Sequence, residues 1–408
     1  MNKNISIIGA GASGLLSSVI LAKKGFNVTV FEKNTKAGRK ILATGNGKCN
    51  ISNENLSMDN FHSSSKDFPT YAINTFTYKK FEEFFNNLGL LLLKGSGTKV
   101  YPLSLQASSV SDILYSEALR YGVKFIFNSY IEDIKSQNNI YIIKSNNDTY
   151  KCSKLIIASG SSAMKKLGST SSGYDVAKQY KHKIIEPFAS LVQLTSKDNS
   201  IYRLSGVKTN SLVKLYVNNK FVEEKSGDIL FTNYGLSGNT ILDLSRNASY
   251  SLQKNKKIQI HIDILPNMSN EYLVNLFNQR KELLKTKEIN FLLESLINKK
   301  FIPYILNKAY LDRNKIYINQ LSKNDISNVI NQIKNIKVDI NDTKGFDSAE
   351  VVAGGIDVRD IDNKTMQSKL QKNLYFCGEV LDVDGACGGY NLHWAWASAF
   401  VMSQSINL

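Results

Sequence analysis

The sequence predicts an α/β protein in which a parallel sheet with covering helices is interrupted by a second, inserted domain. Two observations lead to this prediction. Short β-branched apolar runs at residues 4–9 and 28–31 flank a helical pattern at 12–24, and such a crossover joins parallel strands. The alternation of strand and helix patterns then stops near residue 189 and returns only near residue 350. We therefore expect a split domain at residues 1–188 and 347–408, with an insert at 189–346.

The other elements of the first part follow from the spacing of apolar residues. Residues 69–88 and 109–121 have the amphipathic spacing of helices, and residues 124–127 have the pattern of a strand. The stretch 130–157 alternates β-rich pieces with polar turns. This pattern predicts an antiparallel meander that leads into a further sheet strand at 155–158.

The insert divides into two parts by its patterns. Residues 189–265 are expected to be mostly β and residues 266–346 mostly helical. The clearest expected elements are strands at 213–217 and 257–262 and helices at 272–284 and 289–297.

The composition is that of a globular protein. The chain has 408 residues, of which 42% are hydrophobic and 21% charged, which excludes a disordered chain or a fibre. No apolar run approaches the roughly 18 residues that span a bilayer, so we expect a cytoplasmic protein without a membrane partner. The four cysteines lie at least ten positions apart, which predicts no metal site and no disulfide framework: Cys49, Cys152, Cys377 and Cys387.

The formal net charge of +16 raises the question of an anionic partner such as nucleic acid. Of the 51 basic residues, 44 are Lys, whereas Arg is the residue that phosphate and base recognition favours. The excess is also diffuse, at +11 for residues 1–188, +9 for 189–346 and −4 for 347–408. We therefore do not expect a dedicated nucleic-acid site.

A glycine motif follows the first predicted strand. Residues 9–14, GAGASG, match GxGxxG between a strand and a helix, and Glu32 follows 18 residues after Gly14, at the end of the next strand. In such a motif Gly9 permits the tight turn, Gly11 lets the backbone approach a pyrophosphate, and Gly14 lets the helix pack on the strand. The carboxylate of Glu32 can accept hydrogen bonds from ribose hydroxyls and would repel a 2′-phosphate. The motif therefore predicts a Rossmann-like domain that binds FAD or NAD rather than NADP.

The segment after this unit favours FAD. Residues 36–53 form a long Gly-, Asn- and Lys-rich stretch, where a simple dehydrogenase would continue with another helix. Such a loop can fold back over the pyrophosphate and bring backbone amides toward a flavin ring.

A third motif lies near the C-terminus. A strand at residues 373–379 closes on Gly378 and Glu379, and a helix is expected at 392–405. A carboxylate at this strand end suits the ribityl hydroxyls of FAD. A helix that begins near Gly389 would point its positive end at the flavin and stabilise negative charge there.

On these motifs the chain resembles, over essentially its whole length, a bacterial family of NAD(P)/FAD-dependent flavoproteins. This YhiN-like or BaiN-like family includes members described as aminoacetone oxidases or bile-acid reductases. The likeness is carried by GAGASG with Glu32, GRKILATGNGKCNISN from Gly38, SGDILFTNYGLSGNTILDLSR from Ser226, and AEVVAGGIDV with YFCGEVLDVDGACGGYNLHWAW near the C-terminus. The resemblance implies a two-dinucleotide-binding-domain flavoprotein fold, interrupted by a domain with a β-barrel-like part and a helical part.

The resemblance also implies which residues hold FAD. The ADP half would be held by Gly9, Gly11, Ser13, Gly14, Glu32, Lys33 and Arg39, with the backbone of Ile131 at the adenine edge. The flavin half would be held by Asn46, Gly47, Cys49, Asn50, Gly160, Gly378, Glu379, Gly389, Tyr390 and Asn391. The chain departs from the family pattern at Asn239, Ala386, Cys387 and His393, which leaves the substrate open.

The leading functional hypothesis is an oxidoreductase in which NAD(P)H reduces the flavin, which then reduces an electron-poor small molecule such as an activated C=C bond. NAD(P)H would bind transiently, because no second GxGxxG follows a strand, and the CxxxxC pair of disulfide reductases is absent. The candidate proton donors are Tyr390, Tyr234 and His393. The alternatives are a peroxide-producing oxidase of an amine or alcohol, an RNA-associated flavoprotein and a flavin-bound protein without turnover. The sequence does not indicate an oligomeric state.

Overall fold

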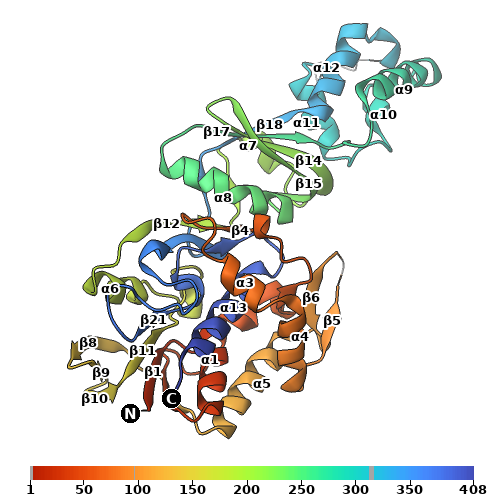
Figure 1. Cartoon of the computed structure of the whole chain (residues 1–408). Coiled ribbons are helices and arrows are strands. Elements are labelled where there is room, and N and C mark those ends of the chain that lie inside the picture. Colours follow the sequence, from red (N-terminus) through yellow and green to blue (C-terminus); the bar gives the residue numbers. More distant parts are fainter. Residues whose placement is uncertain (1–2, 96, 312–316) are drawn as a thin grey trace. The chain divides into compact units, whose positions relative to one another are not determined.

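The computed structural model describes residues 3–95, 97–311 and 317–408. The chain divides into two compact units, the first comprising Met1–Ala189 with Phe346–Leu408 and the second Ser190–Gly345 (Figure 1). Each unit has its own apolar core.

The first unit is built on a parallel sheet. The strands are β1 (Asn4–Ile8), β2 (Asn27–Phe31), β7 (Lys124–Ile126), β11 (Lys154–Ile157) and β21 (Leu374–Phe376), in the order β21-β11-β1-β2-β7. All four neighbouring pairs in this order are parallel. Ile5, Ile7 and Ile8 of the central strand are buried, as expected for a strand covered on both faces. The predicted α/β class with a parallel sheet is confirmed.

Helices cover this sheet. The helix after the glycine motif is α1 (Ala12–Lys23), which packs against α13 (Tyr390–Ser405) and α5 (Ala107–Arg120). The meander consists of β8 (Ile131–Gln137), β9 (Ile140–Ser145) and β10 (Asp148–Cys152), which pair antiparallel in chain order. A further helix, α6 (Ser172–Gln179), follows β11, and β12 (Ile184–Ser190) pairs with β20 (Val351–Ile356).

The structure corrects two expectations in this unit. The helix expected at 69–88 is broken into α3 (Thr70–Thr75) and α4 (Tyr78–Asn87), because Phe76 leaves the helical conformation and the Thr77 side chain caps the second helix by accepting from Lys80 N. The loop expected at 36–53 contains the short helix α2 (Arg39–Ala43) and a 3₁₀ turn at Thr44–Gly47. The small strands of the unit are β3 (Ser52–Asn53), β4 (Phe61–His62), β5 (Leu92–Lys94), β6 (Lys99–Pro102) and β22 (Asp384–Gly385).

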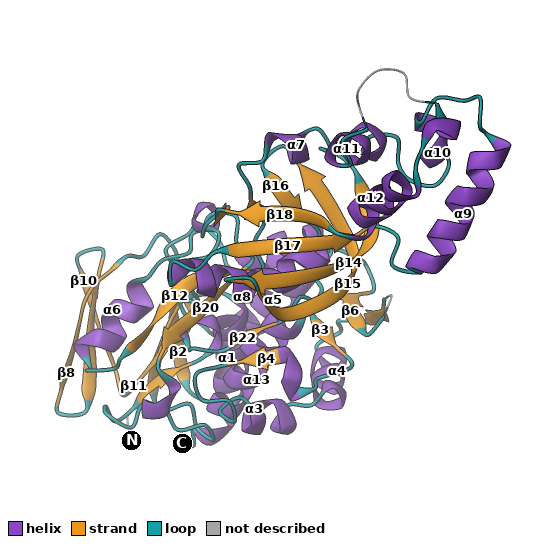
Figure 2. Ribbon diagram, turned by 90° about the horizontal axis from the view of Figure 1, so that it is seen from above, coloured by secondary structure: helices purple, strands orange, loops and turns teal. Residues whose placement is uncertain are grey.

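The second unit contains a seven-stranded sheet in the order β18-β17-β14-β15-β16-β13-β19. Figure 2 shows β17, β14 and β15 side by side, and these neighbours pair antiparallel. The strands are β13 (Leu194–Thr195), β14 (Lys208–Val217), β15 (Lys220–Thr232), β16 (Gly235–Ser237), β17 (Ile258–Asp263), β18 (Ile336–Ile340) and β19 (Asp342–Thr343).

Helices lie both among and after these strands. The helices are α7 (Asn199–Tyr202), α8 (Asn239–Gln253), α9 (Asn270–Leu283), α10 (Asn290–Leu293), α11 (Phe301–Lys308) and α12 (Lys323–Lys334). The structure thus places a long helix, α8, where we expected mostly strands, and the strand β18 where we expected mostly helices. The apolar residues Ile241, Leu244 and Ala248 of α8 recur at helical spacing and are fully buried, so packing decides its conformation. The helix expected at 289–297 is reduced to α10.

Candidate functional site

The chemistry-bearing residues of the first unit gather at the carboxyl ends of four neighbouring strands. Glu32 follows β2, the glycine turn follows β1, Gly160 follows β11, and Glu379 follows β21. Because adjacent strands lie about 4.8 Å apart, these four ends form a row about 14 Å long. Ligands of open α/β sheets bind beyond the carboxyl ends of the strands, so this row is the candidate site.

The glycine turn is tight at two positions and open at the third. A Cβ atom on Gly9, which has φ +104°, would lie 2.5 Å from the carbonyl oxygen of Ala158, and one on Gly14 would lie 1.9 Å from that of Gly9. A Cβ atom on Gly11 would meet no atom within 4 Å. Gly11 is the N-cap of α1, so the open position lies where the helix offers backbone N–H groups to an anion.

Glu32 is held by backbone groups. Its side chain is 9% exposed, and its Oε2 accepts from the backbone N–H of Ala10 at 2.9 Å. Its Oε1 accepts from Asn34 twice, from the backbone N–H at 2.9 Å and from Nδ2 at 2.6 Å. The carboxylate is thereby fixed against the glycine turn by protein groups.

Two basic residues predicted to hold the ADP half lie beside Glu32. Arg39 Nη1 donates to Asn34 Oδ1 at 2.8 Å, which connects it to the carboxylate through Asn34. Burial lowers the pKa of the Lys33 ammonium, and the charge of Glu32 opposes that shift. Both cations therefore lie at the Glu32 end of the row.

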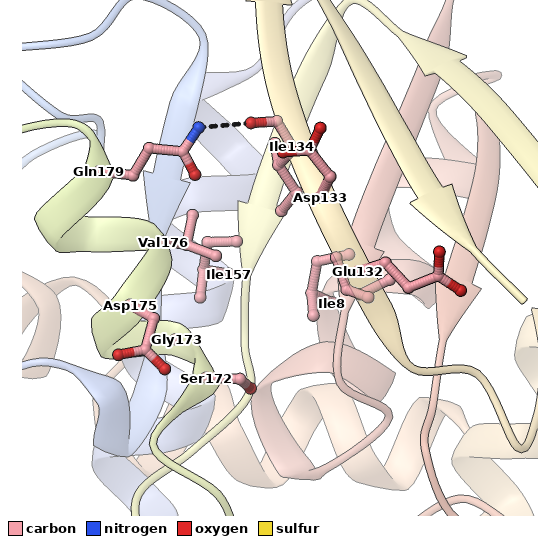
Figure 3. A pocket seen from close by; sticks show the side chains of 11 residues that line it. Ile8, Glu132, Asp133, Ile134, Ile157, Ser172, Gly173, Asp175, Val176 and Gln179 are labelled. Carbon is pink, nitrogen blue, oxygen red and sulfur yellow. Dashed lines mark hydrogen bonds between the residues drawn. The ribbon is translucent and has the colours of Figure 1, made fainter.

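Ile131, expected at the adenine edge, also lies near this end. The backbone N–H of Ser129, two residues earlier, donates to the carbonyl oxygen of Glu32 at 3.0 Å. Ile131 also lines a pocket of about 280 Å³ between the meander and α6, to which Ile8 and Ile157 contribute from the sheet (Figure 3). The residues that line this pocket also include Glu132, Asp133 and Asp175.

Glu379 ends the row on the β21 side. Its Oε2 accepts from Lys40 Nζ at 2.7 Å and its Oε1 from the backbone N–H of Val352 at 3.2 Å. A Cβ atom on Gly160, which has φ +72°, would lie 4.0 Å from Glu379 Oε2. A Cβ atom on Gly378 would lie 2.6 Å from Ser13 Oγ, so this strand end packs directly on the glycine motif.

The expected flavin loop has an unusual backbone. Gly45, Asn46, Gly47 and Cys49 all have φ between +54° and +83°. Cys49 is fully buried, and burial raises the pKa of its thiol to about 11, which keeps it protonated and unreactive near neutral pH. Asn50 Oδ1 is buried without a hydrogen-bond partner among the described residues.

The end of this loop meets the start of α13. A Cβ atom on Gly389, the N-cap of α13, would lie 2.4 Å from the carbonyl oxygen of Ser52 and 2.9 Å from Asn50 Oδ1. Asn391 has its side-chain amide engaged in the preceding turn, where it accepts from Gly385 N and donates to Gly385 O, both at 2.8 Å. The expected flavin loop and the N-terminus of α13 therefore form one local structure.

The three candidate proton donors lie in different surroundings. His393 is fully buried, with Nδ1 2.8 Å from Ser52 Oγ and Nε2 2.8 Å from the carbonyl oxygen of Phe76. Burial lowers its pKa to about 4, and both ring nitrogens lie within hydrogen-bond distance of protein groups, so the structure favours a neutral core residue over a proton donor at this position. Tyr390 is the first residue of α13 and packs edge-on against Phe61 at 5.7 Å. Tyr234 belongs to the second unit, where Lys344 Nζ lies 4.8 Å from its ring centre.

Two further contacts of the site were not predicted from the sequence. Lys40 lies in the stretch expected to meet the FAD pyrophosphate, but nothing in the local pattern connects it to Glu379. His62 on β4 is paired with Asp384 on β22, and residues directly opposite in an antiparallel pair share one face of the sheet about 5 Å apart. Asp384 is fully buried and His62 is half-buried. This places an imidazole and a carboxylate together just before the turn that leads into α13.

The row suits a bound dinucleotide. The glycine turn leaves room at Gly11, and acids lie at both ends. Ser159 Oγ, beside Gly160, and two further buried polar atoms close to the row have no partner among the described residues. One is Asn50 Oδ1 beside Gly389; the other is the hydroxyl of Tyr174, close enough for Glu379 and Asp382 to raise its pKa further after burial. Buried polar atoms without partners are rare, so a polar ligand is the expected partner.

The described residues lack the features of two other kinds of site. They contain no group of three or more His, Cys, Asp or Glu side chains that could hold a metal ion. No helix in the same part of the chain combines the length and the apolar character needed to cross a membrane.

A parallel sheet with this glycine turn and an acid on the next strand defines a Rossmann-type nucleotide-binding protein. The chain belongs to the HI0933-like family, because the model of that family's Rossmann domain matches residues 3–405. This finding confirms the resemblance seen in the sequence.

Two similar relatives are full-length matches. A 3-dehydro-bile acid delta(4,6)-reductase from Clostridium scindens is 33% identical over 407 residues, which covers 99% of either chain. A ribosomal RNA dihydrouridine synthase from Haemophilus influenzae is 32% identical over 409 residues, which covers 98% of either chain. Among solved structures, a 3-ketosteroid-delta4-(5alpha)-dehydrogenase from Rhodococcus jostii aligns over 99% of this chain and 96% of its own, with TM-score 0.48 and 10% identity.

Proposed function

We propose that this chain is an FAD-dependent oxidoreductase that uses NAD(P)H to reduce an activated C=C bond. The observation that carries the proposal is the row of four strand ends, with an open glycine turn in the middle and a carboxylate at either end. This arrangement suits a ligand with a diphosphate in the middle and hydroxyl-bearing chains on both sides, which is the build of FAD.

The residues of the row have distinct parts in this proposal. Glu32 binds the adenosine ribose, the glycine turn and the α1 N-terminus bind the diphosphate, and Glu379 binds the ribityl chain. FAD supplies a ring that accepts and donates hydride. The N-terminus of α13 at Gly389 provides a positive dipole end that favours negative charge on this ring.

The names of the two relatives support the reaction class. A delta(4,6)-reductase and a dihydrouridine synthase both describe the saturation of a C=C bond in a conjugated, electron-poor system. We therefore assign the same class of bond to the substrate of this chain. Reduction of such a bond needs a hydride at one carbon and a proton at the other.

The proton source is proposed from the first unit. Tyr390 and His62 lie on neighbouring elements, because Phe61, which precedes His62, packs against the Tyr390 ring. A half-buried imidazole opposite a carboxylate is a suitable general acid. We favour His62, oriented by Asp384, over Tyr390 as the proton donor.

The substrate is proposed to be a small molecule, with RNA as the second candidate. The hypothesis of an RNA substrate is favoured by the name of the Haemophilus influenzae relative and by the +9 charge of residues 189–346. The hypothesis of a small-molecule substrate is favoured because that charge is diffuse and consists mostly of Lys. A peroxide-producing oxidase of an amine or alcohol would use the same FAD site.

Anaerobic reduction of the purified protein tests the proposal. NADH or NADPH should bleach the flavin absorbance at about 450 nm, and an α,β-unsaturated ketone should then restore it without oxygen. The absence of bleaching by both nucleotides would contradict the reductase assignment. Bleaching by an amine or alcohol, with peroxide release in air, would support the oxidase instead. Steeply salt-dependent binding of ribosomal RNA, with flavin reoxidation by that RNA, would support the RNA substrate.

A further inference from the structure

The short helix α2 connects the two ends of the candidate site. The backbone N–H of Gly38, just before α2, donates to the carbonyl oxygen of Ala10 at 2.9 Å, so the helix starts against the glycine turn. The first residue of α2, Arg39, reaches Asn34 at the Glu32 end, and the second, Lys40, reaches Glu379 at the other end. Two consecutive cations are thus divided between the two acidic ends.

The Lys40–Glu379 pair lies next to the turn that would bind the diphosphate. On one side, Lys40 is two residues from Gly38, which bonds to the turn at Ala10. On the other side, Glu379 follows Gly378, whose Cα lies so close to the motif that a Cβ atom would be 2.6 Å from Ser13 Oγ. Each partner of the ion pair therefore lies within two residues of a glycine that contacts the glycine motif, Gly38 for Lys40 and Gly378 for Glu379.

Either member of this ion pair can also readily exchange its partner for another charged or polar group. The side chains of Lys40 and Glu379 are 28% and 18% exposed, and a partly exposed ion pair contributes little net stability because water competes for both charges. Lys40 offers a point charge on a flexible stem, whereas the guanidinium of Arg39 is tied to Asn34. Of the two cations, Lys40 is the one free to change partner.

We propose that Lys40 is the cation for the diphosphate of the bound dinucleotide and that it leaves Glu379 when the cofactor enters. The exchange gives Lys40 a doubly charged partner and frees Glu379 Oε2 to accept a hydroxyl of the ribityl chain. The inference rests on the proposed function, since the diphosphate is that of FAD. It assigns Lys40 a direct part in cofactor binding, in contrast to a structural ion pair.

The test is the affinity of the full-length chain for FAD after the flavin has been removed with concentrated bromide. Lys40→Met should raise the Kd for FAD about 10- to 100-fold, the range for the loss of one charge-assisted hydrogen bond. It should also make the Kd less dependent on salt, because one screened charge is gone. Lys40→Arg should recover most of the affinity. Lys36→Met is the matched control, since Lys36 is exposed in the same segment and should leave the Kd within about twofold of the wild type.

A second background separates the two roles of Lys40. If Lys40 contacts the diphosphate, Lys40→Met should weaken FAD binding by a similar factor in Glu379→Gln protein. If Lys40 acts only through Glu379, its substitution should have no further effect in that background, which would overturn the inference. An unchanged Kd in the single variant Lys40→Met, or an equal loss in Lys36→Met, would overturn it as well. Wild-type protein that binds no FAD would instead show that the proposed function itself is wrong. Thermal unfolding midpoints of the flavin-free variants report whether each one is folded.

Discussion

The two carboxylates that end the row of strand ends are held in different ways. Glu32 accepts three hydrogen bonds from Ala10 and Asn34, two of them from the backbone, and is nearly buried. Glu379 is held mainly by an ion pair with Lys40, in which both side chains remain partly exposed. The adenosine end of the proposed FAD site is therefore preformed, whereas the flavin end is held by contacts that a ligand can replace.

This difference matches what each end has to do. The adenosine half of a dinucleotide is a handle that only needs to be bound, so rigid backbone donors suit it. The flavin half has to be placed for chemistry, so contacts that rearrange on binding allow the site to close around it.

Substitution in the glycine turn should abolish cofactor binding at both ends. Gly11→Ala adds a Cβ atom that meets no protein atom within 4 Å, so the protein should fold normally and yet retain no FAD, because the methyl group takes the place of the diphosphate. The measurements are the flavin content and the thermal unfolding midpoint.

Gly14→Ala is the contrasting variant. Its Cβ atom would lie 1.9 Å from the carbonyl oxygen of Gly9, so the backbone must shift and the fold should lose about 1–3 kcal/mol. Gly11→Ala protein with full flavin content would show that the diphosphate does not approach this turn.

The flavin end should show the next largest effect, on turnover. His62→Gln should slow reoxidation of the reduced protein by an unsaturated ketone about 100-fold or more, the range for loss of a general acid, while reduction by NAD(P)H continues at the wild-type rate. Stopped-flow measurement of the two half-reactions separates these effects. Equal rates of reoxidation in the variant and the wild type would rule out His62 and leave Tyr390 as the candidate.

The two acids themselves should differ in their effect on stability. Glu32→Gln replaces an acceptor oxygen by an amide donor that faces N–H groups, so the flavin-free protein should lose about 1–3 kcal/mol. Glu379→Gln removes a partly exposed ion pair and should cost less than about 1 kcal/mol. Thermal unfolding of the two flavin-free variants compares them directly. A larger loss in Glu379→Gln would contradict the distinction between a preformed and an exchangeable end.

The smallest effect at neutral pH should come from His393. Its pKa is lowered from about 6.5 to about 4 by burial, so the folded state favours the neutral ring; this stability is complete above about pH 6.5 and is lost as the pH falls toward 4. His393→Gln carries no such proton, and Gln is the residue we expect there in the family.

The variant should therefore match the wild type at pH 7.5 and lose less stability at pH 4.5. Burial lowers the pKa of His182 in the same direction, so the profile of the variant should be shallower rather than flat. Identical profiles for the two proteins would show that His393 does not titrate as described.

The sequence reasoning succeeded where structure is determined locally. The unit β1–α1–β2, with the glycine motif and Glu32, was predicted because short-range periodicity and turn residues define it. The antiparallel meander was predicted for the same reason. The break at Phe76 and the helix α2 were missed, because single residues that end or begin a helix are weak signals inside a longer pattern.

Contacts between residues that are far apart in the sequence could not be predicted. His393 was counted as a candidate proton donor because it follows a motif expected at the flavin. Its partners Ser52 and Phe76 are 341 and 317 positions away, and no local pattern predicts these contacts. The pairing of His62 with Asp384 and of Lys40 with Glu379 was invisible for the same reason. In the second unit, α8 was missed because short strand-like runs predominate in the residues around it.

Whether the row of strand ends in the first unit binds FAD can be measured on the purified protein. The protein is purified without added cofactor, its visible spectrum is recorded, and the nucleotide released on denaturation is identified and quantified against the chain. We predict the spectrum of an oxidised flavin and up to one FAD for each chain, with flavin-free protein taking up FAD to the same ratio. A colourless protein that binds no FAD on titration would contradict the account.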